Sequence, residues 1–270
     1  LFKMFNLTSF QNSDGTVEVK TLDSFYSTST KIWDITKFVD KSESSVDTVL
    51  PFKQIDFGYE GLDNFFAKNH LELFDKKWGT EKYTSTDISK IEGETYKVSI
   101  PLEHFKYERL KDVNGGLFKD LLWGWSADIK QEPNLGKPLL FYPILSTQDI
   151  GVIDSSGTLD IQTDVFIPSN SVRLTDSKNL NFSAEPNEYL GTPFKKTLFL
   201  EYYENYIREI FESQRRLTTI KAFLPLSMTL DLSLSDKIRI FDNLYKINKI
   251  TTNFETNKST LELINIKTTI

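Results

Sequence analysis

The residue types that could carry chemistry are few in this chain. Its two histidines, His70 and His104, lack the short helical spacing of a zinc-binding pair, and they leave a Ser-His-Asp triad without support. There is no cysteine, which excludes disulfides, thiolate metal sites and cysteine nucleophiles. Gly115 and Gly116 lack the residues that complete a phosphate-binding loop. The sequence therefore predicts a protein that is not an enzyme and uses no metal or cofactor.

Acidic residues gather around Trp78, and glycosidases use such carboxylates when one is protonated and another ionised. These acids are Glu72, Asp75, Glu81, Glu92, Glu94 and Glu103. Carboxylates are also common surface groups, which favours an ordinary solvated face. A sugar-stacking platform of Trp123 and Trp125 with Asp128 is a stronger form of the idea, although core aromatics are the commoner case. A glycan-binding or glycan-cleaving β domain is therefore the alternative function.

Composition points to a large, strand-rich core. The chain has 270 residues, 39% of them apolar, with 21 Phe and 11 Tyr beside 12 Gly. Its net charge of −6 argues against a general nucleic-acid-binding surface, and no apolar run or leader pattern predicts membrane anchoring. Residues 1–7 resemble the end of a helix, so we expect the chain to be the C-terminal part of a longer one.

One long amphipathic helix is expected after residue 192, because apolar residues recur there at i, i+3, i+4 and i+7. Its stripe consists of Phe199, Tyr202, Tyr203, Tyr206, Ile207, Ile210 and Phe211. The stripe is predicted to pack on the protein's own barrel. An assembly contact along the same helix is the alternative.

The residues after this helix predict an antiparallel meander. Strict alternation over residues 226–235 predicts a strand with Leu230, Leu232 and Leu234 in the core. Residues 237–241 and 244–253 should form a hairpin across Asp242 and Asn243, and residues 259–266 should follow them in the sheet.

The earlier part of the chain alternates strands with short helices. We expect strands at residues 16–22, 55–59, 96–100 (stopped by a proline) and 139–142 (buried on both faces), a helix at 62–69, a linker at 41–47 and a hairpin around 157. The expected domains are a helix stub, strand and linker (1–46), a first β-barrel (47–150), a hairpin and long connection (151–191), and the amphipathic helix with the C-terminal barrel (192–270).

Several stretches resemble the tail-hub (baseplate-hub) proteins of tailed bacteriophages. They are residues 235–250 and 261–265 near the C-terminus, and Pro51-Phe52-Lys53, Trp78-Gly79, Leu102-Glu103-His104-Phe105 and residues 136–142 earlier. The resemblance implies a mainly-β fold with a few helices, in which two tube-like antiparallel β-barrel domains are present and a long amphipathic helix precedes the C-terminal barrel.

The same resemblance implies a structural virion protein at the tip of a phage tail, made in the host cytoplasm. A homotrimer would present six barrels to the hexameric tail tube, whereas a hexamer would indicate a tube or adaptor subunit. Its partners would be the tail tube, the tape measure and tip or fibre proteins, with DNA only in transit. The candidate lumen residues are Glu18 and Asp231, since acidic strand faces would repel DNA.

Overall fold

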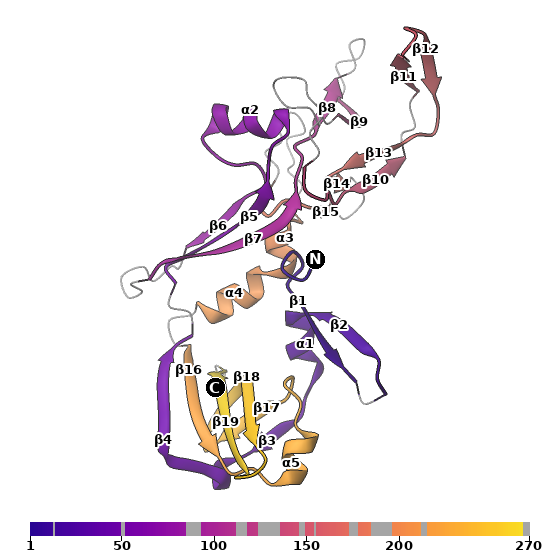
Figure 1. Cartoon of the computed structure of the whole chain (residues 1–270). Coiled ribbons are helices and arrows are strands. Elements are labelled where there is room, and N and C mark those ends of the chain that lie inside the picture. Colours follow the sequence, from indigo (N-terminus) through magenta and orange to yellow (C-terminus); the bar gives the residue numbers. More distant parts are fainter. Residues whose placement is uncertain are drawn as a thin grey trace. The chain divides into compact units, whose positions relative to one another are not determined.

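The structure is a computed structural model that describes residues 1–12, 14–49, 52–84, 93–111, 118–123, 136–145, 149–153, 155–172, 178–184, 196–211 and 215–266. It is mainly β, with 46% strand and 19% helix, as composition and alternation predicted. The chain forms two compact units (Figure 1). Unit 1 comprises Leu1–Gln54, Thr84–Thr95 and Tyr202–Ile270, and unit 2 comprises Ile55–Tyr83 and Tyr96–Glu201. The expected division placed residues 1–46 and 192–270 in separate domains, whereas unit 1 contains both ends of the chain.

Unit 1 is built on a six-stranded sheet in the order β3-β17-β18-β19-β16-β4. Its strands are β3 (Ile32–Asp34), β4 (Val39–Thr48), β16 (Arg216–Ala222), β17 (Lys237–Ile240), β18 (Asn243–Asn253) and β19 (Lys258–Asn265). Neighbouring strands are antiparallel, except that β3 runs parallel to β17. The predicted strands at 237–241, 244–253 and 259–266 are thus confirmed within a residue or so.

The two outer strands of this sheet, β3 and β4, are consecutive in the chain and are joined through the 3-10 turn η1 (Thr36–Phe38). In a flat sheet they would lie five strand spacings apart, roughly 24 Å. The link between them can reach roughly 18 Å at most. The sheet therefore curls until its edges approach each other. No ladder joins β3 to β4, so the described strands do not form a closed barrel.

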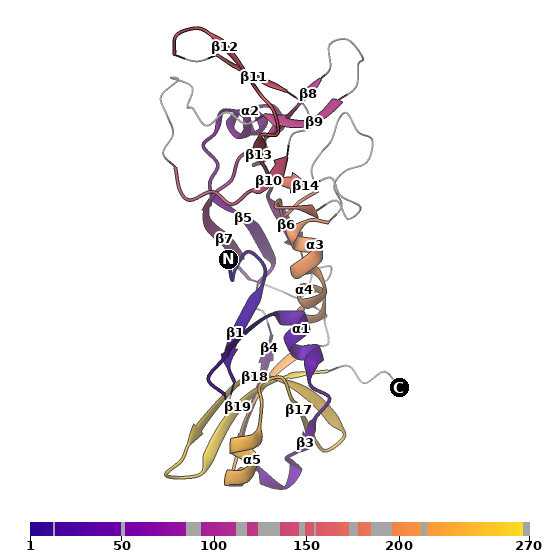
Figure 2. The same ribbon diagram turned by 90° about the vertical axis from the view of Figure 1, so that its right-hand side faces the viewer.

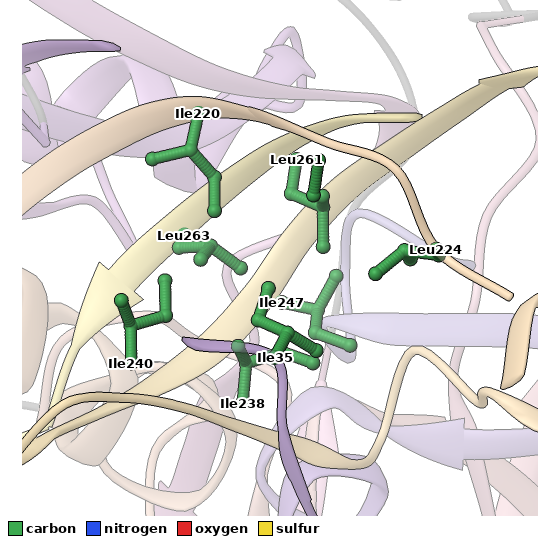
Figure 3. Close-up of a cluster of buried hydrophobic side chains, with 9 residues drawn as sticks. Ile35, Ile220, Leu224, Ile238, Ile240, Ile247, Leu261 and Leu263 are labelled. Atoms are coloured by element: carbon green, nitrogen blue, oxygen red, sulfur yellow. The ribbon is translucent and has the colours of Figure 1, made fainter. Parts of the chain in front are cut away.

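The curled sheet encloses one apolar cluster (Figure 3). Its buried members are Ile35, Ile220, Ala222, Leu224, Ile238, Ile240, Ile247, Leu261 and Leu263. On β19 the side chains of Leu261 and Leu263 point inward and Glu262 lies on the other face. Each fully buried Ile or Leu contributes about 1.5–3 kcal/mol through burial. This cluster is the main source of stability for the sheet.

The N-terminal residues of unit 1 form a turn and a hairpin (Figure 2). The backbone N–H of Phe5 donates to the carbonyl of Leu1 at 3.0 Å, but this turn ends at once in β1 (Leu7–Gln11). The expected helix end is therefore only a single turn. Strand β1 pairs with β2 (Val17–Thr21), which confirms the strand predicted at 16–22, and helix α1 (Leu22–Thr28) follows.

The prediction of one long amphipathic helix is wrong. The structure has two short helices, α3 (Leu198–Tyr202) and α4 (Glu204–Ile210), separated by Tyr203, whose φ of −121° departs from helical geometry. Helix α4 ends at Ile210, and Phe211 is its C-cap residue. The i, i+3, i+4 pattern of apolar residues continues across the break, so the pattern does not mark it.

The predicted strand over residues 226–235 is also wrong, since this segment begins as helix α5 (Leu226–Asp231). Pro225 precedes it with a φ of −57°, which suits a helix start. After the helix, the carboxylate of Asp236 accepts the backbone N–H of Ser233 at 3.0 Å and the indole N–H of Trp33 at 2.9 Å, so the chain turns here. Of the three leucines expected in the core, Leu230 and Leu234 are exposed, and Leu232 is partly buried against the cluster.

Two local predictions in unit 1 need correction. The polar stretch at 41–47 is not a linker, because it lies within β4, which pairs with β16 around a bulge at Ile220 and Lys221. An outer strand with a solvated face accommodates such polar residues. The hairpin loop between β17 and β18 consists of Phe241 and Asp242 rather than Asp242 and Asn243, and Phe241 takes the positive φ of 52°.

Unit 2 contains a three-stranded sheet in the order β6-β5-β7. Its elements are β5 (Gln54–Gly61), α2 (Phe65–Phe74), β6 (Glu81–Thr84) and β7 (Thr95–Glu103). The prediction that Ile55, Phe57 and Tyr59 share a buried face is confirmed. Helix α2 begins later than expected, after the N-cap Asn64. Strand β7 continues through Pro101, because an outer strand needs backbone donors on one side only.

The remaining strands of unit 2 pair in twos. They are β8 (Glu108–Lys111) with β9 (Phe118–Trp123), β10 (Tyr142–Leu145) with β13 (Phe166–Ser169), β11 (Ile150–Ile153) with β12 (Leu159–Gln162), and β14 (Ser171–Val172) with β15 (Lys178–Asn179). The hairpin around Gly157 is confirmed. The doubly buried strand at 139–142 is wrong, because the strand starts at Tyr142 and Phe141 is 44% exposed.

Candidate functional site: a lysine-lined groove above a buried polar cluster

Among the tryptophans considered for sugar binding, the structure describes the side chain of Trp78 but not those of Trp123 and Trp125. Trp78 is only 2% exposed, and its ring meets that of His70 edge-on at 5.1 Å. A ring buried in this way cannot stack on a sugar. Trp123 is the last residue of β9, whereas Trp125 and Asp128 lie outside the described residues. The glycan platform therefore remains a prediction for those residues.

The amphipathic stripe serves internal packing. Phe199, Tyr203, Ile207 and Ile210 are buried, while Tyr202 and Tyr206 are partly buried. The hydroxyl of Tyr203 donates to the carbonyl of Lys3, and burial raises the pKa of Tyr206 above its ordinary value. These side chains thus lie against other residues of the chain, and an assembly contact along the same helices stays a prediction.

The two candidate lumen acids occupy different kinds of element. Glu18 lies on β2, where its carboxylate is 2.6 Å from the ammonium group of Lys20. Asp231 was expected at the centre of a strand, but it is an exposed residue at the end of α5. A continuous acidic strand face that includes Asp231 is therefore wrong, because the segment is helical.

Both histidines are buried in unit 2. The His104 ring stacks on Tyr59 with the ring centres 4.1 Å apart, and its Nε2 lies 2.5 Å from Oδ1 of Asn181. Burial lowers the pKa of His104 to about 4, and the hydrogen bond to Asn181 opposes this shift only in part. The imidazole is therefore neutral at physiological pH. Within the described ranges, no group of three or more histidine or acidic side chains is placed to hold a metal ion.

His104 belongs to a buried polar cluster, which we define as His104, Asn170, Asn179 and Asn181. The side-chain amide of Asn170 donates to Asn181 Oδ1 at 3.4 Å, and the backbone N–H of Asn181 donates to Asn179 Oδ1 at 2.7 Å. Next to them, the Tyr59 hydroxyl donates to the carbonyl of residue 180 at 2.6 Å. These bonds tie the segment at 179–182 to the central strand β5.

The polar cluster lies directly beneath the loop that follows α2. Gly79 has a φ of +68°, and a Cβ there would lie 2.9 Å from both Asn181 Oδ1 and His104 Nε2. Its carbonyl accepts the backbone N–H of Phe182 at 2.9 Å. Both the conformation and the space at this position therefore require glycine. The cluster fixes the position of the loop that runs from Asp75 to Thr80.

This loop and the three-stranded sheet form a groove of about 650 Å³. Asp56 and Gly58 of β5 contribute to it from the sheet face opposite the buried side chains. A Cβ on Gly58 would come within 3.1 Å of the Thr80 methyl group, so the Thr80 side chain packs over this glycine. Thr80 and Ser99 add hydroxyl groups to the lining.

Four lysines line the groove, namely Lys76 and Lys77 from the loop, Lys82 from β6 and Lys97 from β7. None of the four forms an ion pair with another described residue. The lining also contains three carboxylates, Asp56, Asp75 and Glu81, so its formal charge is four minus three, or +1. In a chain with a net charge of −6, this is a local excess of positive charge.

Asp75 and Glu81 belong to the acids noted around Trp78, for which a solvated face was favoured, whereas the lysines were not singled out from the sequence. The only available signal was the pair Lys76-Lys77 beside Trp78-Gly79, because Lys82 and Lys97 lie on separate strands. Comparison of the chain with protein-family models, curated proteins and solved structures finds no match. Separately, no helix in the described ranges is both long and apolar enough to cross a membrane.

Proposed function

We propose that this chain is a structural virion protein that forms the hub at the tip of a phage tail and adapts a hexameric tail tube to a trimeric tip. The sequence resemblance described above motivates the proposal. The mainly-β fold with a few helices is consistent with it. In this function the chain acts through its surfaces and not through catalysis.

The observation that carries the proposal is the curled sheet of unit 1. Its outer strands β3 and β4 are consecutive, and the sheet surrounds a single apolar cluster. Such curvature is what a tube-like barrel needs, and closure between β3 and β4 would remove the remaining sheet edges. We propose that unit 1 supplies one barrel-like module and that the smaller sheets of unit 2 supply the second.

The proposed hub is a homotrimer in the virion, assembled in the host cytoplasm. Its partners would be the tail tube, the tape measure and tip or fibre proteins. DNA would pass through without being bound, because the chain carries 38 acidic against 32 basic residues and Glu18 adds charge on a strand. A hexamer would instead favour a tube or adaptor subunit.

The test is the mass and symmetry of the assembly. Mass photometry over a range of concentrations should give three copies of the 31.2 kDa chain, about 94 kDa, and electron microscopy should show threefold particles. An oligosaccharide titration on the same sample addresses the glycan-binding alternative, which no specific observation favours since Trp78 is buried. A monomer at all concentrations that binds sugar saturably would overturn the hub proposal.

A further inference from the structure

We propose that the groove of unit 2 binds an acidic polypeptide segment of another protein chain. Lys76, Lys77, Lys82 and Lys97 would contact the carboxylates of that segment. The inference deepens the proposed function, on which it rests for the identity of the partner as another tail protein. The charge and the shape of the groove both support it.

The groove lysines differ from several lysines of unit 1 in having no ion-pair partner among the described residues. In unit 1, Lys246 lies 2.6 Å from Glu209, Lys249 lies 3.4 Å from Glu262, and Lys258 lies 3.2 Å from Glu43. The four groove lysines have no such partner within the described ranges. The four lysine ammonium groups outnumber the three carboxylates of the lining by one, so an incoming anionic group gains a net attraction. The groove therefore favours a ligand that carries negative charge.

The mixture of charges in the groove favours a polypeptide over a nucleic acid as the ligand. Asp56, Asp75 and Glu81 line the same groove, so its formal charge is only +1. A nucleic acid has a phosphate at every nucleotide, and some of these would have to face the three carboxylates. An acidic peptide can place carboxylates near the lysines and neutral or basic residues near the acids. Mixed charge in the groove thus matches mixed charge in a protein segment.

The side chains that line the groove also suit an extended peptide. The lining carries small side chains at Thr80 and Ser99, and the Ser99 hydroxyl can hydrogen-bond to a peptide backbone. Phe57 and Tyr59 also border the groove, but both are buried and present no ring for a sugar to stack on. An extended peptide therefore fits this lining better than a glycan.

The loop that carries two of the lysines is held in place before any partner binds. Asp75 ends α2 in the left-handed conformation, with a φ of 50°, and its N–H donates to the carbonyl of Leu71 at 2.9 Å. Gly79 is held against the polar cluster. Lys76 and Lys77 thus project from a fixed turn, which reduces the entropy lost on binding.

The experiment uses the full chain and a fluorescein-labelled peptide of alternating Glu and Ser, followed by fluorescence anisotropy at low ionic strength. The test variant is Lys82→Glu/Lys97→Glu, and the control is Lys37→Glu/Lys178→Glu, which has the same net charge but changes exposed lysines outside the groove. The groove variant should weaken binding by about tenfold or more, and the control by about twofold or less. Lys76→Gln/Lys77→Gln provides a second, neutralising variant of exposed groove residues.

Three outcomes would overturn the inference: absence of saturable peptide binding, equal weakening by the groove and control variants, or tighter groove-dependent binding of oligothymidylate than of the peptide. The melting temperature of each variant verifies that it is folded. Mass photometry of the same samples separates the two proposals. A trimer that does not bind the peptide contradicts only the groove, and a monomer that binds it through the groove lysines contradicts only the hub.

Discussion

Units 1 and 2 differ in what they bury. Unit 1 encloses a cluster of Ile, Leu and Ala side chains within one curled sheet. Unit 2 buries aromatic rings together with polar groups, among them His104, Asn170, Asn179 and Asn181. Apolar burial is non-directional and stabilises a sheet as a whole, whereas buried polar groups must find specific partners. The polar cluster of unit 2 therefore fixes particular loops in place.

The two units also differ at their surfaces. Some lysines of the unit 1 sheet are engaged by neighbouring carboxylates, as Lys246 is by Glu209 and Lys258 by Glu43. In unit 2, a loop fixed by the polar cluster presents Lys76 and Lys77 without such partners among the described residues. This contrast suggests that unit 1 contributes stability and that unit 2 presents a binding surface.

The largest expected effect tests the apolar core of unit 1. Leu263 has no exposed surface, so Leu263→Ala should lower the free energy of unfolding by about 2–5 kcal/mol. Leu230→Ala is the matched control, because Leu230 is 71% exposed, and its effect should stay within about 0.5 kcal/mol. Urea denaturation followed by circular dichroism measures both. Equal losses in the two variants would contradict the assignment of the core.

The sequence predicted the sheet of unit 1 best where strands alternate and end in tight turns. Strands β17, β18 and β19 follow this rule. The same rule failed at residues 226–231, because an alternating pattern on a short amphipathic helix after Pro225 looks like a strand. The discriminating contacts came from Asp236, which bonds to Trp33 about two hundred positions away. The local pattern of apolar and polar residues cannot predict such a long-range contact.

The candidate site was less predictable for the same reason. Nothing local in the sequence indicates that His104 meets Asn181 or that Gly79 rests on both. The groove lysines come from a loop and two different strands. These lysines come together only because the strands pair in a particular register, and that register could not be predicted from the sequence.

The next effect tests the polar cluster through pH. The pKa of His104 is lowered to about 4 from 6.5, so between these values the unfolded chain binds a proton that the folded protein does not. The contribution of neutral His104 to the free energy of unfolding is therefore fully present above about pH 6.5. It falls as the pH decreases, with a slope approaching about 1.4 kcal/mol per pH unit. Urea denaturation between pH 7.5 and 5 should reveal this decline, and His104→Gln should flatten it. An unchanged slope in the variant would assign the decline to other groups.

The smallest effect compares a paired lysine with an unpaired one. Lys246 contacts Glu209 at 2.6 Å and lies 5.3 Å from the ring centre of Tyr26, so Lys246→Gln should cost about 1 kcal/mol, and less at high salt. Lys97 of the groove lacks an ion-pair partner in the described part of the chain, so Lys97→Gln should change stability by less than about 0.5 kcal/mol at any salt concentration. Thermal and urea denaturation at low and high salt measure both. A loss at Lys97 equal to that at Lys246 would mean that the groove lysines already contribute to folding, and the contrast between the two surfaces would fail.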